Sequence, residues 1–469
     1  MASALFGLGV LAGLAVSFTA SASPSYDMDL SIDWERGTYV GEMTVIAENP
    51  TGQALDRLIF RLLPNNDSIY AGASLAIVGA IQGDRAIDPQ LGEDPTILTV
   101  PLLEQLGPGQ TASLTLRFEG AVGPSPVRAD YDSAGYGILT KNDSSLVMTS
   151  FYPLLAPFNE DGPVIHPLCE YGDALWSDAS DYTVRLTADS TLSPASTGQL
   201  ISSSALGDIT LHRIQAEGAR DFALVLTSDL AETELQTGSH TFRAWFSSRQ
   251  TQAATQALTH ALTALDLYTD LLGPLPFDEI DLVEVPLYRA AGVEFTGLIL
   301  LSTNYSMRSS EAIYAILVSH EMAHQWFYAT VGSDPVSEAW LDEGPATFLS
   351  NIFLDHIGRT LGALSERELW EGGYGIAQAN DPTAFIGAPS CEFRTSSTYS
   401  SHVYGGAAHF LQTIRDDVGD AAFFAGLRTY YESHIGEIGT TQSLLASFAE
   451  ACECDLSEIY EAFGFDQPG

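Results

Sequence analysis

The sequence is poor in basic residues. Its 469 residues include 19 lysines and arginines against 60 aspartates and glutamates, and Lys141 is the only lysine. The formal net charge of −41 repels nucleic acid and anionic membrane surfaces, so we expect neither as a partner. The near-complete loss of lysine favours an adaptation to high salt, where counterions screen the self-repulsion, over the ordinary acidity of some secreted proteins.

Positive charge is also missing ahead of the amino-terminal apolar run. Residues 4–20 are apolar but short for a membrane span, and Ala20-Ser21-Ala22 has the small-x-small form of a cleavage site. We therefore predict that residues 1–22 are a signal peptide and that the protein is extracytoplasmic or secreted. A signal anchor, which would be its one link to a membrane, and a plain disordered tail stay open, because no Lys or Arg precedes the run.

Cysteine is scarce as well. The four cysteines are Cys169, Cys391, Cys452 and Cys454, an even number that permits two disulfides in three pairings. They do not have the spacing of a zinc ribbon, which argues against a cysteine-bound metal. Pairing across the single residue between Cys452 and Cys454 would strain the bridge, so we expect at least one long-range disulfide.

The first half lacks helical periodicity. Between about Ser25 and Leu235, short segments with β-branched or alternating residues are separated by Gly, Pro, Asn and Asp. Helical spacing begins at residues 249–272, which end at Gly273-Pro274, and returns from Tyr404 onward. The sequence predicts an α+β multidomain fold, with an antiparallel β-sheet domain over residues 23–240 and a mainly helical domain over residues 241–469.

The pattern His320-Glu321-Met322-Ala323-His324 is present in the second half. On a helix, residues i and i+4 share a face, so both histidines can bind one metal ion. Glu321 is placed to reach a metal-bound water as general base, and Glu343, after eighteen intervening residues, is the natural third ligand. This set leaves a fourth tetrahedral position for water and predicts one catalytic Zn²⁺ per chain, although other divalent metals can occupy such sites.

The surrounding residues favour this metal site over solvated polar side chains. Ser309 and Ser310 precede Glu311 as a helix start, and apolar residues follow at helical spacing, so the imidazoles need buried partners. Pro345 would cost about 3 kcal/mol inside a helix but is harmless in the first turn. We therefore expect Asp342 to be an N-cap and Glu343 to open its helix.

These motifs resemble those of the M1 family of zinc metallopeptidases, the gluzincin aminopeptidases. The resemblance rests on the HExxH run, the eighteen-residue spacer and Trp340-Leu341-Asp342-Glu343-Gly344. It implies a thermolysin-like zinc peptidase domain over residues 241–469, in which His320, His324 and Glu343 bind zinc and Glu321 is the general base. Three pieces resemble the family's N-terminal domain: Phe60-Arg61-Leu62-Leu63-Pro64-Asn65, Phe151-Tyr152-Pro153-Leu154-Leu155 and Arg220-Asp221-Phe222-Ala223-Leu224-Val225.

A second motif precedes the histidines. The segment Ala291-Gly292-Val293-Glu294-Phe295-Thr296-Gly297 resembles the family's Gly-x-Met-Glu-Asn, with Val293 and Phe295 in place of the methionine and asparagine. The resemblance implies that Gly292 and Glu294 bind substrate and that Glu294 holds the free α-amine. A salt bridge from Glu294 to Arg289 is the alternative.

A third motif follows the metal ligands. The segment Tyr404-Gly405-Gly406-Ala407 resembles the family's Tyr-x-x-Gly, although Ala407 replaces the glycine. The resemblance implies that Tyr404 donates a hydrogen bond to the oxyanion, and a plain core tyrosine is the alternative.

The expected function is therefore that of a zinc metallopeptidase, an aminopeptidase that hydrolyses N-terminal residues of peptide substrates through a zinc-activated water. Larger family members continue into a β-sandwich and a helical domain, for which too little chain follows Tyr404, so we expect a short form with an open cleft. A zinc endopeptidase and a non-catalytic M1-like binding protein are the alternatives. The sequence leaves the oligomeric state open.

Overall fold

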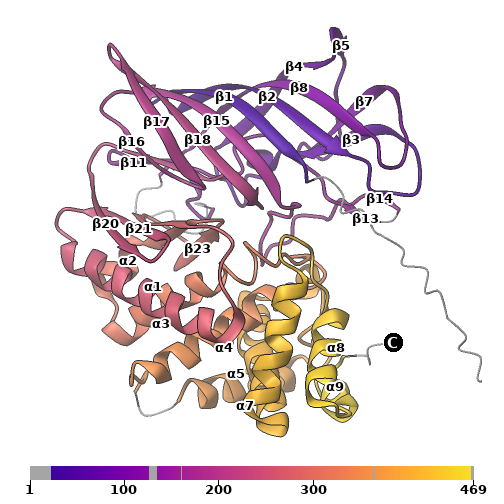
Figure 1. Cartoon of the computed structure of the whole chain (residues 1–469), viewed down its shortest axis with the longest axis vertical. Coiled ribbons are helices and arrows are strands. Elements are labelled where there is room, and N and C mark those ends of the chain that lie inside the picture. Colours follow the sequence, from indigo (N-terminus) through magenta and orange to yellow (C-terminus); the bar gives the residue numbers. More distant parts are fainter. Residues whose placement is uncertain (1–22, 126–134, 160, 363–364, 466–469) are drawn as a thin grey trace, which may run out of the picture.

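The two halves of the chain form two distinct parts of the molecule. The computed structural model describes residues 23–125, 135–159, 161–362 and 365–465. Figure 1 shows broad β-sheets from the first half lying across a smaller sheet and a group of helices from the second half. The predicted signal peptide, residues 1–22, lies outside the described residues.

The largest sheet of the first half has eight strands. In spatial order they are β17 (Gln199–Leu206), β18 (Ile209–Ala219), β15 (Ser180–Asp189), β1 (Ser25–Asp33), β2 (Thr38–Glu48), β8 (Thr111–Ala121), β4 (Ser74–Gln82) and β5 (Arg85–Ile87). β1 and β15 run parallel, and every other neighbouring pair in this sheet is antiparallel. Along β1, Met28 and Leu30 are buried while the intervening Asp29 is exposed, the alternation of a sheet with one wet face.

Smaller sheets complete this half. One contains β12 (Leu154–Leu155), β3 (Leu55–Arg61), β7 (Ile97–Leu106) and β6 (Gln90–Leu91), and another contains β16 (Ser193–Ser196), β19 (Leu224–Thr227), β11 (Ser145–Met148), β10 (Leu139–Lys141) and β9 (Gly123–Pro124). β13 (Phe158–Asn159) and β14 (Gly162–Pro163) form a separate pair. The predicted mainly antiparallel β domain is therefore confirmed.

The second half begins with a mixed sheet. Its strands are β20 (Leu230–Thr237), β21 (His240–Ser247), β22 (Glu279–Val285), β24 (Leu298–Ser302) and β23 (Gly292–Phe295), in that order. β21, β22 and β24 run parallel, and α1 (Thr251–Leu272) makes the crossover between β21 and β22. Six of the seven residues of β22 are buried, as expected for a strand covered on both faces. The predicted domain boundary at residue 240 thus falls within this sheet, between β20 and β21.

Helices make up the rest of this half. They are α2 (Thr303–Arg308), α3 (Glu311–Ala323), α4 (Trp340–His356), α5 (Glu366–Asn380), α6 (Ser396–Ser400), α7 (Ala407–Ser433), α8 (Thr441–Cys452) and α9 (Ser457–Ala462). A π-helical turn at Ser401–Gly406 precedes α7, and short 3₁₀ turns lie at Leu63–Asn65 and Ser390–Glu392. Among the described residues, no helix combines the length and apolarity needed to cross a membrane.

Both pairs of cysteines form disulfides. Cys169 pairs with Cys391 across 222 positions, which confirms the expected long-range bridge. Cys452 also pairs with Cys454, although we expected pairing across a single residue to be difficult. Glu453 ends α8 in the left-handed conformation (φ 51°, ψ 38°), and the resulting bend brings the two Cα atoms to 5.1 Å, within the usual range for a disulfide.

A buried arginine joins the two halves. Arg220 follows β18, is 2% exposed, and donates from Nε to the carbonyl of Tyr328 (2.7 Å) and from Nη2 to that of Thr330 (3.1 Å). It also donates to the carbonyls of Glu437 and Ser177. Burial lowers the pKa of Arg220, so the carbonyl acceptors must compensate for its desolvation.

The neighbouring carboxylate continues this joint. Asp221 accepts hydrogen bonds from the backbone and hydroxyl of Thr296 and from the hydroxyl of Tyr328, both in the second half. A cluster of buried apolar side chains contributed by both halves, including Val225 and Val283, packs nearby. The Arg220-Asp221 pair therefore fixes the position of one half against the other.

We predict that Arg220→Met lowers the free energy of unfolding by at least about 3 kcal/mol, because several buried carbonyls lose their donor at about 1–3 kcal/mol each. Urea denaturation monitored by tryptophan fluorescence measures this. Arg85→Met, at an exposed arginine on β5, is the control and should change stability by less than about 0.5 kcal/mol. Equal losses in the two variants would contradict the assigned role of Arg220.

Candidate metal centre and cleft

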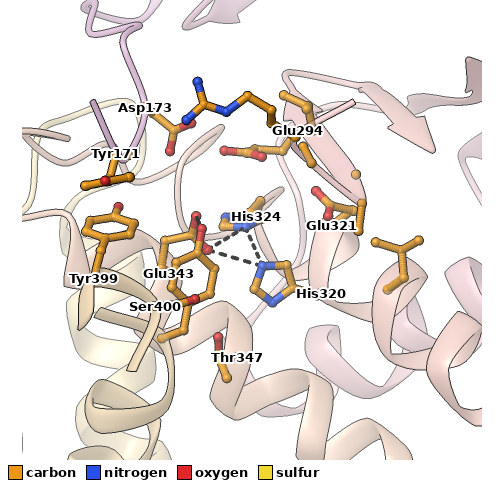
Figure 2. Close-up of a pocket in the computed structure, with 18 of the residues that line it drawn as sticks. Tyr171, Asp173, Glu294, His320, Glu321, His324, Glu343, Thr347, Tyr399 and Ser400 are labelled. Atoms are coloured by element: carbon orange, nitrogen blue, oxygen red, sulfur yellow. Dashed lines mark hydrogen bonds and ion pairs between the residues drawn. The ribbon is translucent and has the colours of Figure 1, made fainter. Parts of the chain in front are cut away.

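Two helices bring the three predicted metal ligands together. His320 lies on α3, His324 is its C-cap residue, and Glu343 lies on α4. The Nε2 atoms of His320 and His324 are 3.1 Å apart, and Glu343 Oε2 lies 3.2 Å from the first and 3.5 Å from the second (Figure 2). A tetrahedral ion with ligands at about 2.0–2.2 Å separates them by about 3.3–3.6 Å. The three atoms therefore fit one zinc ion.

The donor set also suits a cation chemically. Glu343 Oε2 is buried and has no hydrogen-bond partner among the described residues. Although burial opposes ionisation, the neighbouring His320 and His324 hold the pKa of Glu343 well below its usual value. An ionised carboxylate facing two imidazole nitrogens is the His₂Glu arrangement of catalytic zinc sites.

Local sequence explains the position of the histidines. Ser310 caps α3 by accepting a hydrogen bond from the backbone of Ile313, which confirms the predicted helix start. His324 keeps helical dihedral angles (φ −62°, ψ −15°) at the C-cap, so the i, i+4 geometry persists to the end of the helix. The His324 side chain is 1% exposed, whereas that of His320 is 16% exposed and faces the cleft.

Asp342 has a different role from the predicted N-cap. α4 begins at Trp340, after Ala339 as N-cap, so Glu343 does not open the helix and Pro345 lies inside it. The Asp342 carboxylate instead lies 2.5 Å from His324 Nδ1. Such a contact orients a metal-binding imidazole and presents its other nitrogen to the metal. The adjacent acidic pair Asp342-Glu343 was the only sequence signal for this role.

Glu321 points into the cleft beside β23. It is 4% exposed, its Oε2 has no hydrogen-bond partner among the described residues, and burial raises its pKa to about 7. Gly292 lies against it, because a Cβ at that position would be 2.3 Å from Glu321 Oε1. A carboxylate with a pKa near neutrality is suited to accept and return a proton.

Glu294 lies on β23, and one of its carboxylate oxygens is within 4.8 Å of a His324 ring nitrogen. It is 8% exposed, and burial raises its pKa well above the usual value. The predicted alternative, a salt bridge to Arg289, is absent from the described residues, and that guanidinium lies over the ring of Tyr136. Glu294 therefore faces the cleft without a cationic side-chain partner among the described residues.

Tyr404 lies on the π-helical turn before α7. Its hydroxyl donates to Glu343 Oε1, and its ring stacks against His320 with 6.0 Å between centroids. This side chain borders the metal centre, which distinguishes it from a plain core tyrosine.

The site opens into a cavity of about 720 Å³ lined by both halves. The first half contributes Tyr171 and Asp173, which sequence reasoning missed because they lie outside any recognised motif. Desolvation in the cavity, followed by repulsion from Glu343, raises the pKa of Asp173 to about 8. Figure 2 shows Asp173 beside Glu294, above the metal ligands.

Comparisons with known proteins agree with this geometry. A model of the peptidase family M1 domain matches residues 256–463. Aminopeptidase N of Lactobacillus delbrueckii subsp. lactis is 25% identical over 241 residues, which are 47% of this chain and 28% of that protein. Endoplasmic reticulum aminopeptidase 1 of Mus musculus is 35% identical over 229 residues, 45% of this chain and 24% of that protein. The chain thus spans less than a third of the length of these curated relatives.

Solved structures match nearly the whole chain. The M1 zinc metallopeptidase of Deinococcus radiodurans has a TM-score of 0.68 at 19% identity, with 95% of this chain and 94% of that chain covered. A mutant of it bound to a Tyr-Ser-Ala substrate has a TM-score of 0.65 at 18% identity, with 95% and 94% covered. These matches confirm the predicted two-part fold.

We predict that Asp342→Asn weakens zinc binding by about 10–100-fold, because His324 loses the carboxylate that orients it. Competition with a chromophoric chelator measures the affinity. Asp355→Asn, at an exposed position on the same helix, removes the same charge and should leave the affinity unchanged. Unchanged zinc affinity in Asp342→Asn would contradict this role.

Proposed function

Because this chain carries a peptidase family M1 domain at residues 256–463, we propose that the protein is a zinc-dependent aminopeptidase that removes N-terminal residues from peptides. The observation that carries the proposal is the convergence of His320 Nε2, His324 Nε2 and Glu343 Oε2 within 3.5 Å. Glu321 lies beside them, and its Oε2 has no hydrogen-bond partner among the described residues. His320, His324 and Glu343 would hold one zinc ion, which when bound polarises a carbonyl and makes water a stronger acid.

Glu321 serves as the general base. Its buried carboxylate accepts the proton of the attacking water and then passes it to the leaving amine. Tyr404 donates its hydroxyl hydrogen to the oxyanion that develops at the scissile carbonyl. In the structure this hydroxyl donates to Glu343, so it already lies at the edge of the metal centre.

Glu294 provides the preference for a free amino terminus. A buried carboxylate without a partner is costly, and a substrate ammonium in the cleft supplies the missing positive charge. Gly292 keeps the strand close to Glu321, so peptide backbone can pass along this edge. The zinc endopeptidase alternative applies if Glu294 does not bind an amine, and a non-catalytic binding protein is disfavoured because all three ligands and the base are present.

An extracytoplasmic location belongs to the same proposal. The support is the pairing of all four cysteines in disulfides, which persist in oxidising compartments.

We predict that the wild-type protein with zinc cleaves a free peptide and leaves its N-acetylated form intact, and that a chelator abolishes the activity. Glu321→Gln should lower kcat by about 10²–10⁴-fold because the general base is lost. Glu311→Gln, at an exposed glutamate in the first turn of the same helix, is the control. The assays are run at low and at multimolar salt.

Two outcomes of that assay would overturn the proposal. Equal cleavage of both peptide forms would identify an endopeptidase. No cleavage by the wild-type protein loaded with stoichiometric zinc, at any salt concentration, would identify a binding protein.

For Tyr404→Phe we expect a fall in kcat of about 10²–10³-fold, because one donor to the oxyanion is lost. Steady-state kinetics on the free peptide test this. Tyr314→Phe is the matched control, since the Tyr314 hydroxyl is buried without a hydrogen-bond partner among the described residues. Parallel small effects in the two variants would remove Tyr404 from the catalytic residues.

A further inference from the structure

The hairpin that carries Glu294 ends in a short turn. β23 and β24 pair antiparallel and leave only Thr296 and Gly297 between them, and we call these two residues the hairpin turn. Gly297 has a φ of +68°, and a Cβ there would be 2.9 Å from the Glu279 carbonyl oxygen, so this position requires glycine. Because a hairpin turn sets the register of both strands, its position determines where Glu294, two residues earlier, lies.

A glutamine beside a metal ligand holds the hairpin turn. Gln325 directly follows His324 and is fully buried. Its Nε2 donates to the carbonyl of Phe295 (3.3 Å), and its Oε1 accepts from the backbone N–H of Gly297 (3.0 Å). One side chain thus binds the backbone on both sides of Thr296 and links the hairpin to the segment that carries His324.

A carboxylate of the first half holds the same turn. Asp221 Oδ2 accepts from the backbone N–H of Thr296 (3.1 Å) and from its hydroxyl (3.2 Å). The hydroxyl of Tyr328 donates to the same oxygen (2.8 Å), and the hydroxyl of Thr197 donates to Asp221 Oδ1 (3.4 Å). Asp221 is 2% exposed, so little solvent competes for these hydrogen bonds. The hairpin turn is therefore tied to both halves of the chain.

The backbone of Tyr328 is shaped by the same joint. Its φ of 128° is rare for a residue other than glycine, and such a conformation persists only where the surrounding structure imposes it. Arg220 donates to the Tyr328 carbonyl (2.7 Å), and the Tyr328 N–H donates to the carbonyl of Val331 (2.9 Å). The preceding carbonyl, that of Phe327, lies 3.2 Å from Nδ1 of His324. The joint between the halves therefore also holds the backbone beside this metal ligand.

The carboxylate of Glu294 has no comparable support of its own. Among the described residues, it makes no hydrogen bond or ion pair with another side chain. One of its oxygens lies within 4.8 Å of a His324 ring nitrogen, and Figure 2 shows the two side chains in the same part of the cleft. The separation between Glu294 and the metal ligands therefore depends on how β23 and the hairpin turn are held.

We propose that Gln325 and Asp221 are positioning residues, which hold the hairpin turn and thereby fix the distance of Glu294 from the metal ligands. This inference rests on the proposed aminopeptidase function. Neither Gln325 nor Asp221 is among the described residues that line the cavity, so both act through the turn and not on the substrate. A residue of the first half thus takes part in setting the geometry of the cleft.

The test measures binding of Phe-Ala-Ala and N-acetyl-Phe-Ala-Ala to the zinc-loaded Glu321→Gln protein by isothermal titration calorimetry. Adding Gln325→Met should lower the ratio of free-peptide to acetylated-peptide affinity by about tenfold. Two buried backbone groups of the hairpin then lose their partner, and a displacement of about 1 Å is enough for such a loss. The affinity for the acetylated peptide should stay the same, which a general loss of structure would not allow.

Gln412→Met is the control for this variant. Gln412 is a buried glutamine of α7, and its Nε2 donates to Asp416 (2.7 Å). The substitution removes the same amide group from the second half without touching the hairpin, so it should preserve the affinity ratio.

The contribution of Asp221 is tested with two threonines on the same background. The hydroxyls of Thr296 and Thr197 belong to buried residues, and each donates to Asp221 and accepts from one backbone N–H. Thr296→Val should lower the affinity ratio in the same direction as Gln325→Met, whereas Thr197→Val leaves the hairpin turn untouched and should preserve the ratio. Chelator competition and thermal melts verify that every variant binds zinc and is folded.

The outcomes separate the two proposals. If the Glu321→Gln protein binds both peptides equally, amine recognition is absent, and the proposed function and this inference both fall. If that protein prefers the free peptide and both Gln325→Met and Thr296→Val preserve the preference, Glu294 stands and the positioning roles are overturned. Equal losses of preference in the variants and their controls would overturn these roles as well. If only Thr296→Val preserves the preference, the role of Asp221 falls and that of Gln325 stands.

Discussion

Carboxylates that are buried beside one another need positive charge nearby, and this requirement explains how the side chains of the cleft are arranged. Glu343 faces the Nε2 atoms of two histidines, and Asp342 contacts the remaining nitrogen of His324. Glu294 and Asp173 lie a few ångströms further on with no cation of their own among the described residues. The zinc ion and the substrate ammonium of the proposed function would supply this positive charge, because an uncompensated buried charge is strongly unfavourable.

These groups come from both halves of the chain, so the site depends on how the halves are joined. Arg220 donates to backbone carbonyls of the second half, and Asp221 accepts hydrogen bonds from Thr296 and Tyr328. The same joint lies next to the strand that carries Glu294, since Thr296 directly follows β23. The Cys169–Cys391 disulfide also links the segment that precedes Asp173 to the second half. The structural connection between the halves is thus also the support of the cleft.

Much of the architecture followed from local patterns. Ser310 marks the start of α3, Gly273 marks the end of α1, and alternating burial in the first half gives one-sided sheets. Two local arrangements differ from what the sequence suggests. The propensity of proline predicts Pro345 in a first turn, but α4 begins at Trp340 and the buried Pro345 lies inside it. Cys452 and Cys454 pair because a left-handed residue between them bends the chain, which the spacing does not reveal.

The sequence by itself determined the candidate metal ligands and the division into a β half and a helical half. Helical periodicity places His320 and His324 on one face of a helix, with Glu321 beside the first of them. Strand patterns likewise depend only on residues two positions apart, so the sequence shows both features directly. Only the tertiary structure decided that Asp342 contacts His324, that Glu294 has no cationic partner among the described residues, and that Asp173 enters the cleft from the other half. Such contacts join residues far apart in the chain, and their geometry depends on how the whole fold packs.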